Sequence, residues 1–390
     1  IGVEPVGNRL RVNIDGRQMA SYPMPDPNDA QAWGALTAAV ISASRYHSRD
    51  LDSADPERLY EAVFDGLLTE LDSFSRYAGR DAARENRASR EGFGGIGVRI
   101  RLIEEGVLVL SVMEGTPAED AGILQDDVIV AIDDSSVEGL SQRDVVNRLR
   151  GRTGTEVHLS IERESVAQPM PVAVKRSHIV PQTVSYHREG NLAYIRLTGF
   201  NNRTADTLRQ KIRQAQNEIG TDLHGYILDL RGNPGGLLEQ AIAVSDVFVT
   251  GGRIVSTHGR HTDSHQYFRA KVEDLTEDAP VVVLIDGGSA SASEIVAAAL
   301  QDSGRAVLVG SSSFGKGTVQ TVQQLSNTGE LILTWARFHA PSGYALHRRG
   351  VLPDICTTGD AATPGEVMGL ITSGALPLSA ALRRQDVNSN

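Results

Sequence analysis

The chain has 390 residues, of which 40% are hydrophobic and 22% are charged, and its formal net charge is −11. This length and composition exclude an intrinsically disordered protein and predict about two or three domains, each with its own core. The acidity argues against a nucleic-acid-binding protein, which needs a basic face to neutralise phosphates. A single cysteine, Cys356, excludes an internal disulfide framework and a cysteine-rich zinc site.

The sequence contains no run of about 18 consecutive apolar residues, so we expect no membrane-spanning helix. The best candidate, residues 365–382, is interrupted by Glu366, Pro377 and glycines. The chain begins at Ile1, and no charged segment followed by an apolar run stands near its start. We expect the natural start to have been removed, together with any export signal.

Residues 1–90 are predicted to form an N-terminal region that is largely helical. Residues 1–28 are mixed and end in a proline cluster, which is typical of a linker. Apolar residues then recur at helical spacing after Asp29 and again after Asp55, which precedes a proline suited to a first helical turn. Residues 80–91 are charged and rich in arginine, which indicates a solvated helix or a linker.

Residues 91–165 are predicted to form a compact, mostly β module. Glycines at its start introduce short strand-like runs, and one helical stretch covers residues 141–150. The expected strands are residues 96–102, 107–112, 128–132 and 157–163. Residues 165–190 contain Pro169, Pro171 and Pro181, and we expect them to be a connector.

Residues 166–356 are predicted to form an α/β core, because strand and helix patterns alternate from Leu192 onward. Continuous apolar strands such as residues 281–285 are typical of a sheet that is covered on both faces. Residues 357–390 are expected to form a helical C-terminal segment. The fold class is therefore α/β and multidomain, with the β module inserted after the helical N-terminal region.

The segment from Asp286 to Glu294 reads Asp-Gly-Gly-Ser-Ala-Ser-Ala-Ser-Glu and stands between an apolar strand and a helix. A serine here lies at a helix N-terminus, where free N–H groups and the helix dipole favour negative charge. That setting suits the stabilisation of an oxyanion. Serine is also a preferred N-cap residue, and small residues let a helix approach a sheet. Alone, the motif does not separate these two interpretations.

Lys316 stands between Gly315 and Gly317, just before a segment that alternates like a strand. A phosphate-binding loop needs its lysine directly before Ser or Thr and a helix after them. Here an extra glycine precedes Thr318, and the strand pattern replaces the helix. This disfavours nucleotide binding, and a tight hairpin with a solvated lysine remains as the structural alternative.

Two glycine-rich turns offer backbone N–H groups. The turn within residues 228–236 follows an apolar strand, and amides in such a turn can face an anion or an extended peptide. Pro234 stands where a trypsin-like enzyme has its serine, and no Ser-His-Asp triad is evident. At the start of the β module, successive amides of Gly95, Ile96, Gly97 and Val98 can bind a carboxylate, so that an extended tail adds as a strand.

Histidines 258, 261 and 265 lie among Thr, Gly, Asp and Ser residues, which indicates a loop rather than a metal-binding helix. The pairs Asp126-Asp127 and Asp133-Asp134 are interpreted as turn carboxylates rather than calcium ligands. We expect neither a metal nor another cofactor.

Taken together, these segments resemble the carboxyl-terminal processing proteases, also called tail-specific proteases. These are serine endopeptidases with an embedded PDZ domain. The resemblance covers residues 55–355, and its blocks occur in the order of the family. The blocks are residues 94–98, 228–236, 288–294, 314–320 and 341–355.

The resemblance implies a nucleophile in the serine block and a general base in the Gly-Lys-Gly block. The spacing in the family leads from Lys316 to Ser291, and not to Ser289 or Ser293. It further implies Gln320 as a supporting residue. Backbone amides near Gly235, Gly236 and Ala292 are implied as the oxyanion hole. A lysine amine can act as a base where burial lowers its pKa toward neutrality, and no histidine is placed to serve instead.

By resemblance, the PDZ segment spans residues 92–164. Asp126 occupies a turn position that prefers glycine, and because Asp tolerates a left-handed conformation the fold should survive. A second departure from the family pattern is residues 71–77, which we interpret as structural.

The resemblance implies that the PDZ domain captures the C-terminus of protein substrates with unstructured tails, which the core then cleaves. It also implies an exported protein, in the bacterial periplasm or associated with a membrane, and a possible homo-oligomer or adaptor partner. The alternatives are a non-catalytic PDZ adaptor on a protease-like scaffold and a nucleotide-dependent enzyme that uses Lys316.

Overall fold

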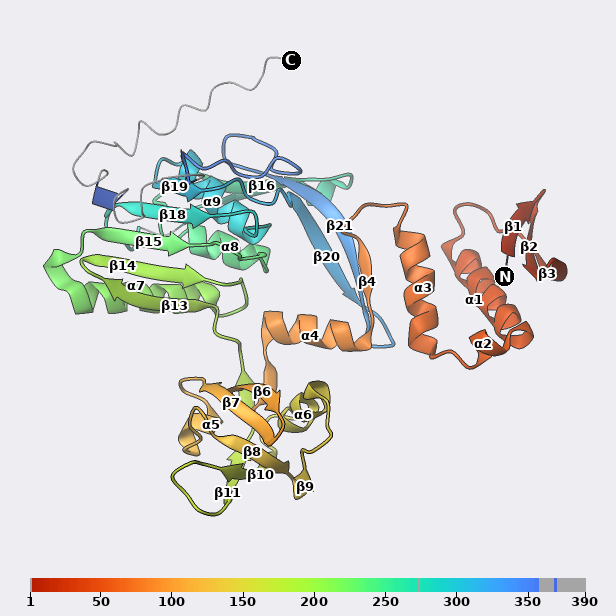
Figure 1. The fold of residues 1–390 in the computed structure, drawn as a ribbon. Helices are drawn as coiled ribbons and strands as arrows, with labels where there is room; N and C mark the ends of the chain where they lie inside the picture. Colours follow the sequence, from red (N-terminus) through yellow and green to blue (C-terminus); the bar gives the residue numbers. More distant parts are fainter. Residues whose placement is uncertain (1, 272–273, 358–367, 370–390) are drawn as a thin grey trace. The chain divides into compact units, whose positions relative to one another are not determined.

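The computed structural model describes residues 2–271, 274–357 and 368–369 (Figure 1). The chain divides into two compact units, which are Ile1–Arg80 with Gln324–Leu331, and Asp81–Gln323 with Ile332–Asn390. The second unit contains the β module and the α/β core. None of the helices in the described ranges is both long and apolar enough to cross a membrane.

The first unit begins with a three-stranded antiparallel sheet, which the sequence analysis did not predict. Its strands are β1 (Gly2–Val6), β2 (Arg9–Ile14) and β3 (Arg17–Pro23). Tight turns connect them, with Gly7, Asp15 and Gly16 at positive φ. Strand β1 is exposed throughout, whereas β2 places Leu10, Val12 and Ile14 on its more buried side, an alternation that the sequence analysis missed.

The N-terminal helices are present as predicted, and caps at Asp29 and Asp55 explain where two of them start. The Asp29 carboxylate accepts a hydrogen bond from the Ala32 N–H, and that of Asp55 accepts one from the Glu57 N–H. The elements here are α1 (Ala30–His47), α2 (Arg49–Asp52), α3 (Pro56–Leu68) and β4 (Arg76–Ala78). In the second unit, the arginine-rich stretch forms helix α4 (Arg80–Glu91).

The β module is a sheet in the order β11-β10-β8-β7-β6, with a short strand, β9, paired to β8. Its strands are β6 (Val98–Ile103), β7 (Gly106–Val112), β8 (Val128–Ile132), β9 (Ser135–Ser136), β10 (Glu156–Glu162) and β11 (Met170–Lys175). Its helices are α5 (Pro117–Asp120) and α6 (Gln142–Leu149). Asp126 has a φ of 69°, so it occupies the left-handed turn position predicted for it.

The prediction of a connector over residues 165–190 was wrong. This stretch holds β11, then β12 (Ser177–Ile179), which pairs with β5 (Phe93–Gly95), and then β13 (Val184–Glu189). The first of these strands was missed because it contains Pro171, and proline is unusual within a strand. Because β11 lies at the edge of its sheet, a missing N–H on its outer side costs no ladder hydrogen bond.

The core sheet has the order β13-β14-β15-β18-β19-β22, and these neighbours are parallel except for β13 and β14 (Figure 1). Its further strands are β14 (Leu192–Leu197), β15 (Gly225–Asp229), β18 (Val281–Ile285), β19 (Ala306–Gly310) and β22 (Ile355–Cys356). Alternate side chains of β18 enter two different clusters, Val283 in one and Val282 in the other. Both faces are therefore covered, as predicted.

The first of these clusters includes side chains of the three core helices. They are α7 (Thr204–Ile219), α8 (Leu238–Ser245) and α9 (Ala292–Asp302). Short 3₁₀ turns occur at η1 (Gly220–Asp222) and η2 (Thr262–Ser264). The predicted arrangement of an α/β core, an inserted β module and a helical N-terminal region is thus confirmed.

A further sheet has the order β17-β16-β21-β20. Its strands are β16 (Arg253–His258), β17 (Gln266–Arg269), β20 (Thr318–Gln324) and β21 (Glu330–His339). The predicted C-terminal helical segment, residues 357–390, lies outside the described residues except for residues 357 and 368–369. Met368 is buried against the outer face of the core sheet.

Candidate active site

Ser291 is the N-cap residue of α9, at the end of the loop that follows β18. Its φ of 55° and ψ of −110° are unusual for a residue with a side chain. Strained backbone of this kind persists where the surrounding structure fixes it, and it clusters at functional sites. Ser291 is half-buried.

The three serines of the motif have different surroundings. Ser289 is fully buried, and its hydroxyl donates to the Leu230 carbonyl at 2.8 Å. Ser293 is also fully buried, and its hydroxyl donates to the Asn233 carbonyl at 2.9 Å. The Ser291 hydroxyl donates no hydrogen bond to any of the described residues. Two of the serines are therefore structural, and Ser291 alone presents a hydroxyl that is available for chemistry.

The Glu294 carboxylate joins the serine loop to the lysine loop. Glu294 is fully buried, and four donors surround its two oxygens. The Ser313 hydroxyl and the Gly315 N–H donate to Oε1 at 2.6 and 2.7 Å. The backbone N–H groups of Ser291 and Lys316 donate to Oε2 at 2.7 and 2.9 Å. This one carboxylate therefore brings the backbones of Ser291 and Lys316 together.

Burial raises the pKa of Glu294, because it disfavours a charged carboxylate, and the hydrogen bonds from Ser313, Ser291, Gly315 and Lys316 oppose that effect. Three of the four donors are backbone N–H groups, which cannot accept a proton in return. The four donors thus stabilise the ionised carboxylate of Glu294, whereas its burial destabilises that same form.

The glycines beside Lys316 let its loop pack closely on residues 346–349. Gly315 has a φ of 88°, and its carbonyl accepts a hydrogen bond from the Arg348 N–H at 2.8 Å. A Cβ atom on Gly317 would collide with the backbone of His347. Lys316 itself is half-buried. A side chain at Gly317 would therefore force this loop away from residues 346–349.

Gln320 is half-buried on β20, four residues beyond Lys316. Val319 packs against the hydrophobic core, so the side chain of Gln320 lies on the opposite face of β20, together with that of the buried Thr318.

The glycine turn after β15 packs directly against Ser291. A Cβ atom on Gly235 would lie 2.9 Å from the Ser291 Cβ and from the Ala292 N. The Gly235 N–H donates to Asn233 Oδ1 at 2.9 Å. The N–H groups of Gly236 and Ala292 have no hydrogen-bond partner within the described ranges. The predicted oxyanion-hole residues are thus brought together around Ser291, with the Gly235 amide already engaged.

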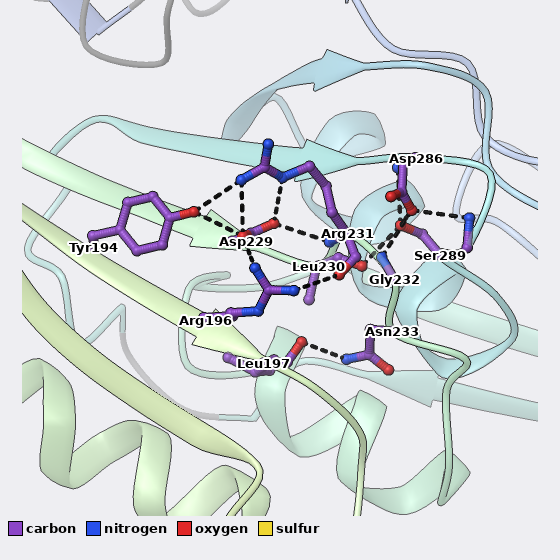
Figure 2. A network of polar contacts seen from close by, with 11 residues as sticks. Tyr194, Arg196, Leu197, Asp229, Leu230, Arg231, Gly232, Asn233, Asp286 and Ser289 are labelled. Atoms are coloured by element: carbon purple, nitrogen blue, oxygen red, sulfur yellow. Dashed lines mark hydrogen bonds and ion pairs between the residues drawn. The ribbon is translucent and has the colours of Figure 1, made fainter.

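An ion-pair network around one buried aspartate, which the sequence analysis missed, supports this turn (Figure 2). Asp229 is fully buried at the end of β15, where it accepts hydrogen bonds from Arg231 Nε at 2.9 Å, Arg196 Nη1 at 3.0 Å and the Tyr194 hydroxyl at 2.7 Å. Burial alone would raise the pKa of Asp229, but the hydrogen bonds from Arg231 and Tyr194 outweigh it and hold the pKa below its usual range. The signal was an acidic residue inside an otherwise apolar strand, with an arginine two residues later.

A second carboxylate connects the two loops around Ser291. Asp286 Oδ1 accepts hydrogen bonds from the Gly232 N–H at 2.8 Å and the Gly288 N–H at 2.9 Å (Figure 2). Gly232 lies in the turn after β15, and Gly288 lies in the loop after β18. The turn is therefore fixed relative to the serine loop at two points, by the hydrogen bond from Gly232 to Asp286 and by the close packing of Gly235 on Ser291.

The predicted peptide-binding residues lie where β5 leads into β6, the outermost strand of its sheet. Gly97 has a φ of 91°, and its carbonyl accepts a hydrogen bond from the Met113 N–H at 2.9 Å. A Cβ atom on Gly97 would collide with Thr116. The Ile96 carbonyl accepts a hydrogen bond from the Ala118 N–H. The carbonyls of this loop are thus occupied, beside an open strand edge.

The histidine loop adjoins a fourth histidine, His339, which the sequence did not connect with it. The ring of His258 lies 5.0 Å from that of His339 and 5.2 Å from that of His265, measured between centroids. The ring of His261 instead lies 5.5 Å from that of Trp335, tilted by 31°. Across the described part of the chain, no three His, Cys, Asp or Glu side chains are arranged to hold a metal ion.

Comparison with known protein families gives two matches. The profile described as "Peptidase family S41" matches residues 191–357, and the profile described as "PDZ domain" matches residues 94–174. The β module thus corresponds to the second profile.

Similar proteins span most of the chain. A carboxy-terminal-processing protease of Bartonella bacilliformis is 44% identical over 303 residues, which cover 77% of this chain and 70% of that protein. A carboxy-terminal processing protease of Bacillus subtilis is 34% identical over 304 residues, which cover 77% of this chain and 64% of that protein. The solved structure of a photosystem II D1 C-terminal processing protease is 26% identical, with a TM-score of 0.47, and the alignment covers 90% of this chain and 97% of that one.

Proposed function

Because the chain belongs to peptidase family S41, among the carboxy-terminal processing proteases, we propose that it cleaves polypeptide tails with Ser291 as nucleophile and Lys316 as general base. The reaction is the hydrolysis of a peptide bond through an acyl-enzyme. The PDZ domain supplies the substrate by binding its free C-terminus.

The Ser291 hydroxyl attacks the scissile carbonyl, and its proton passes to Lys316. A neutral lysine can take this proton, whereas an arginine in its place could not. The protonated amine then gives the proton to the leaving amide nitrogen, so the first product departs as an amine. Water, activated by the same lysine, next attacks the ester and releases the second product. Gln320 orients the amine by a hydrogen bond from the same face of β20.

The tetrahedral oxyanion is stabilised by backbone N–H groups. Ala292 lies at the positive end of the α9 dipole, and Gly236 supplies the opposite side of the hole. The Gly235 N–H joins them only if Asn233 Oδ1 releases it, because that amide is engaged in the structure. Removing one such donor from an enzyme typically costs about 10²–10³ in kcat.

The PDZ domain binds the C-terminal residues of the substrate along β6. The N–H groups of Gly95, Ile96, Gly97 and Val98 receive the terminal carboxylate, and the tail adds as a strand at the open edge. Unstructured tails suit this mode because both modules bind an extended chain.

The single observation that supports this proposal most strongly is the shared carboxylate of Glu294, which fixes the Ser291 and Lys316 backbones around one oxygen. The experiment is cleavage of an unstructured peptide with a free C-terminus. Ser291→Ala and Lys316→Ala should each abolish turnover. The matched controls Ser312→Ala and Lys211→Ala should retain it. Full activity of Lys316→Ala would contradict the assignment of the base, and tail binding without any turnover would identify a non-catalytic adaptor.

A further inference from the structure

One face of the sheet β17-β16-β21 is basic and aromatic, although the chain as a whole is acidic. Residues 253–269 and 332–339 contain one carboxylate, that of Asp263. The same two segments supply the members of what we call the basic–aromatic face. They are Arg253, His258, Arg260, His261, His265, Tyr267, Arg269, Trp335, Arg337 and His339.

Strand register shows that the central members of this face point away from the core. Phe268 and Phe338 pack in the core, so the residues beside them, which include the exposed Tyr267 and Arg337, point outward. Across the strands, Ser256 pairs with Tyr267 and with His339, and His258 pairs with Arg337. The rings of His258 and Tyr267 lie 5.6 Å apart between centroids.

The face exposes groups that proteins usually cover or neutralise. Tyr267 is 58% exposed and Trp335 is 38% exposed. Arg253 lies over the Tyr267 ring at 5.2 Å from its centroid. The arginines at positions 253, 260, 269 and 337 form no ion pair with any carboxylate among the residues that the structure describes. Exposed aromatic rings beside unneutralised cations suit a ligand that is acidic and partly apolar.

Strand β21, which carries part of the basic–aromatic face, adjoins the lysine loop through its backbone. The Phe338 N–H donates to the carbonyl of Gly317, the residue after Lys316, at 3.1 Å. Neighbouring strands are about 4.8 Å apart, so β16 lies roughly 10 Å from the lysine loop. An extended chain covers that distance in about three residues, at about 3.3 Å per residue.

We propose that the basic–aromatic face is a substrate subsite that binds acidic side chains about three residues from the scissile bond, with Trp335 and Tyr267 accepting an adjacent apolar side chain. The inference rests on the proposed function, since its occupant is the extended substrate. The main argument is charge complementarity between acidic substrate side chains and this face. The face is cationic, although the chain has a net charge of −11.

The test compares two peptides that share their C-terminal residues and scissile bond, so that any contribution of the PDZ domain is equal. One carries Glu at the third and fourth positions on either side of the bond, and the other carries Gln there. The full chain should cleave the Glu peptide with a kcat/KM about two- to fivefold higher for each contact that forms. The preference should shrink in about 0.5 M salt, where charges are screened beyond about 4 Å.

The double variant Arg260→Gln/Arg337→Gln should bring the ratio of kcat/KM on the Glu peptide to that on the Gln peptide close to one. Arg188→Gln, which replaces another exposed arginine, on β13, is the matched control and should keep the preference. Equal rates on both peptides, or an unchanged preference in the double variant, would overturn the inference and leave the proposed function standing.

A second measurement separates the inference from catalysis. Fluorescence anisotropy of the same two peptides on Ser291→Ala chains reports binding without turnover. A Glu preference that disappears in the double variant supports the subsite even if the chain cleaves neither peptide, an outcome that would count against the proposed function alone. Equal affinities for both peptides would contradict the subsite.

Discussion

The backbone N–H groups of Ser291 and Lys316 donate to the same oxygen atom, Oε2 of Glu294, at 2.7 and 2.9 Å. The two residues belong to loops that follow different strands of the core sheet, β18 and β19. Each loop supplies hydrogen-bond donors to this buried carboxylate. The carboxylate therefore holds the two loops, and with them the two residues, in a fixed relative position.

Replacing Glu294 by Gln should impair both stability and activity. The amide keeps the volume but turns one acceptor into a donor, which then faces either Ser313 and Gly315 or Ser291 and Lys316. We expect a loss of about 2–4 kcal/mol in the free energy of unfolding, as for other buried charge networks that lose one partner. Urea unfolding and kcat on a tail peptide measure the two effects. Glu239→Gln, on the exposed side of α8, should change neither.

Gly235→Ala should lower kcat more than it lowers stability. The new methyl group would lie 2.9 Å from the Ser291 Cβ and would displace the nucleophile. Gly232→Ala is the matched control, because Gly232 also has a positive φ, of 67°, but faces open space. Gly232→Ala should lose about 1–2 kcal/mol of stability from backbone strain, and Gly235→Ala should lose more, because its methyl group would also lie 2.7 Å from the Ala290 carbonyl oxygen. Similar activity in the two variants would show that contact with Ser291 is unimportant.

Asp229→Asn should loosen the turn that carries Gly235 and Gly236. The change leaves Arg231 and Arg196 facing a neutral amide, and we expect a loss of about 2–4 kcal/mol. Chemical denaturation checks this figure. Asp206→Asn, whose carboxylate pairs with Arg209 at the surface of α7, should cost less than about 0.5 kcal/mol. If Asp229→Asn also cost less than about 0.5 kcal/mol in the free energy of unfolding, the network in Figure 2 would contribute little to stability.

The PDZ domain should lose stability in acid through Asp127. Burial alone would raise the pKa of Asp127, but hydrogen bonds from Arg163 and from the Leu124 N–H hold it below its usual range. A carboxyl group with a lower pKa in the folded state stabilises that state above its unfolded pKa of about 3.9. This contribution is lost as the pH falls through the folded value.

Hydrogen-exchange protection factors of β8 and β10, measured between about pH 6 and pH 3, report this effect locally. They should fall less steeply in Arg163→Gln than in the parent chain, since that variant has already lost the interaction. Arg152→Gln, at an exposed turn of the same domain, should follow the parent. Identical slopes in all three proteins would count against Asp127 as the source.

Amidating the C-terminus of a tail peptide should reduce kcat/KM by about tenfold. The amide removes the charge that the N–H groups of residues 95–98 are proposed to bind, and a charged hydrogen-bond partner is worth about 1.5–3 kcal/mol. Steady-state cleavage of the free and amidated peptides measures the ratio. If both are cleaved equally well, capture does not depend on the carboxylate.

Much of the fold followed from local sequence signals, because apolar periodicity and caps operate over a few residues. The caps at Asp29 and Asp55 placed two helices, and the run Val281–Ile285 indicated a sheet covered on both faces. Strands β2 and β11 do alternate in burial, but each is only six residues long, and the prolines around them were interpreted as linkers. Strands β1 to β3 pair with their neighbours in sequence, and β11 pairs with β10, so the missed signal was local.

The candidate site was predictable only in part for the same reason. Spacing and resemblance led to Ser291 and Lys316, but Glu294 looked like one more residue of the serine block. Its importance lies in donors that come from a loop about twenty residues away in sequence. Similarly, nothing near His258 in the sequence indicates that its ring contacts that of His339.

The most direct test of the central claim is the rate at which Lys316→Arg cleaves an unstructured tail peptide at about pH 8. Arginine keeps the positive charge and most of the length of the side chain but cannot act as a base. The proposed dyad predicts a loss of about 10²–10⁴ in kcat, the usual contribution of general acid–base catalysis. Cleavage at the parent rate would contradict it.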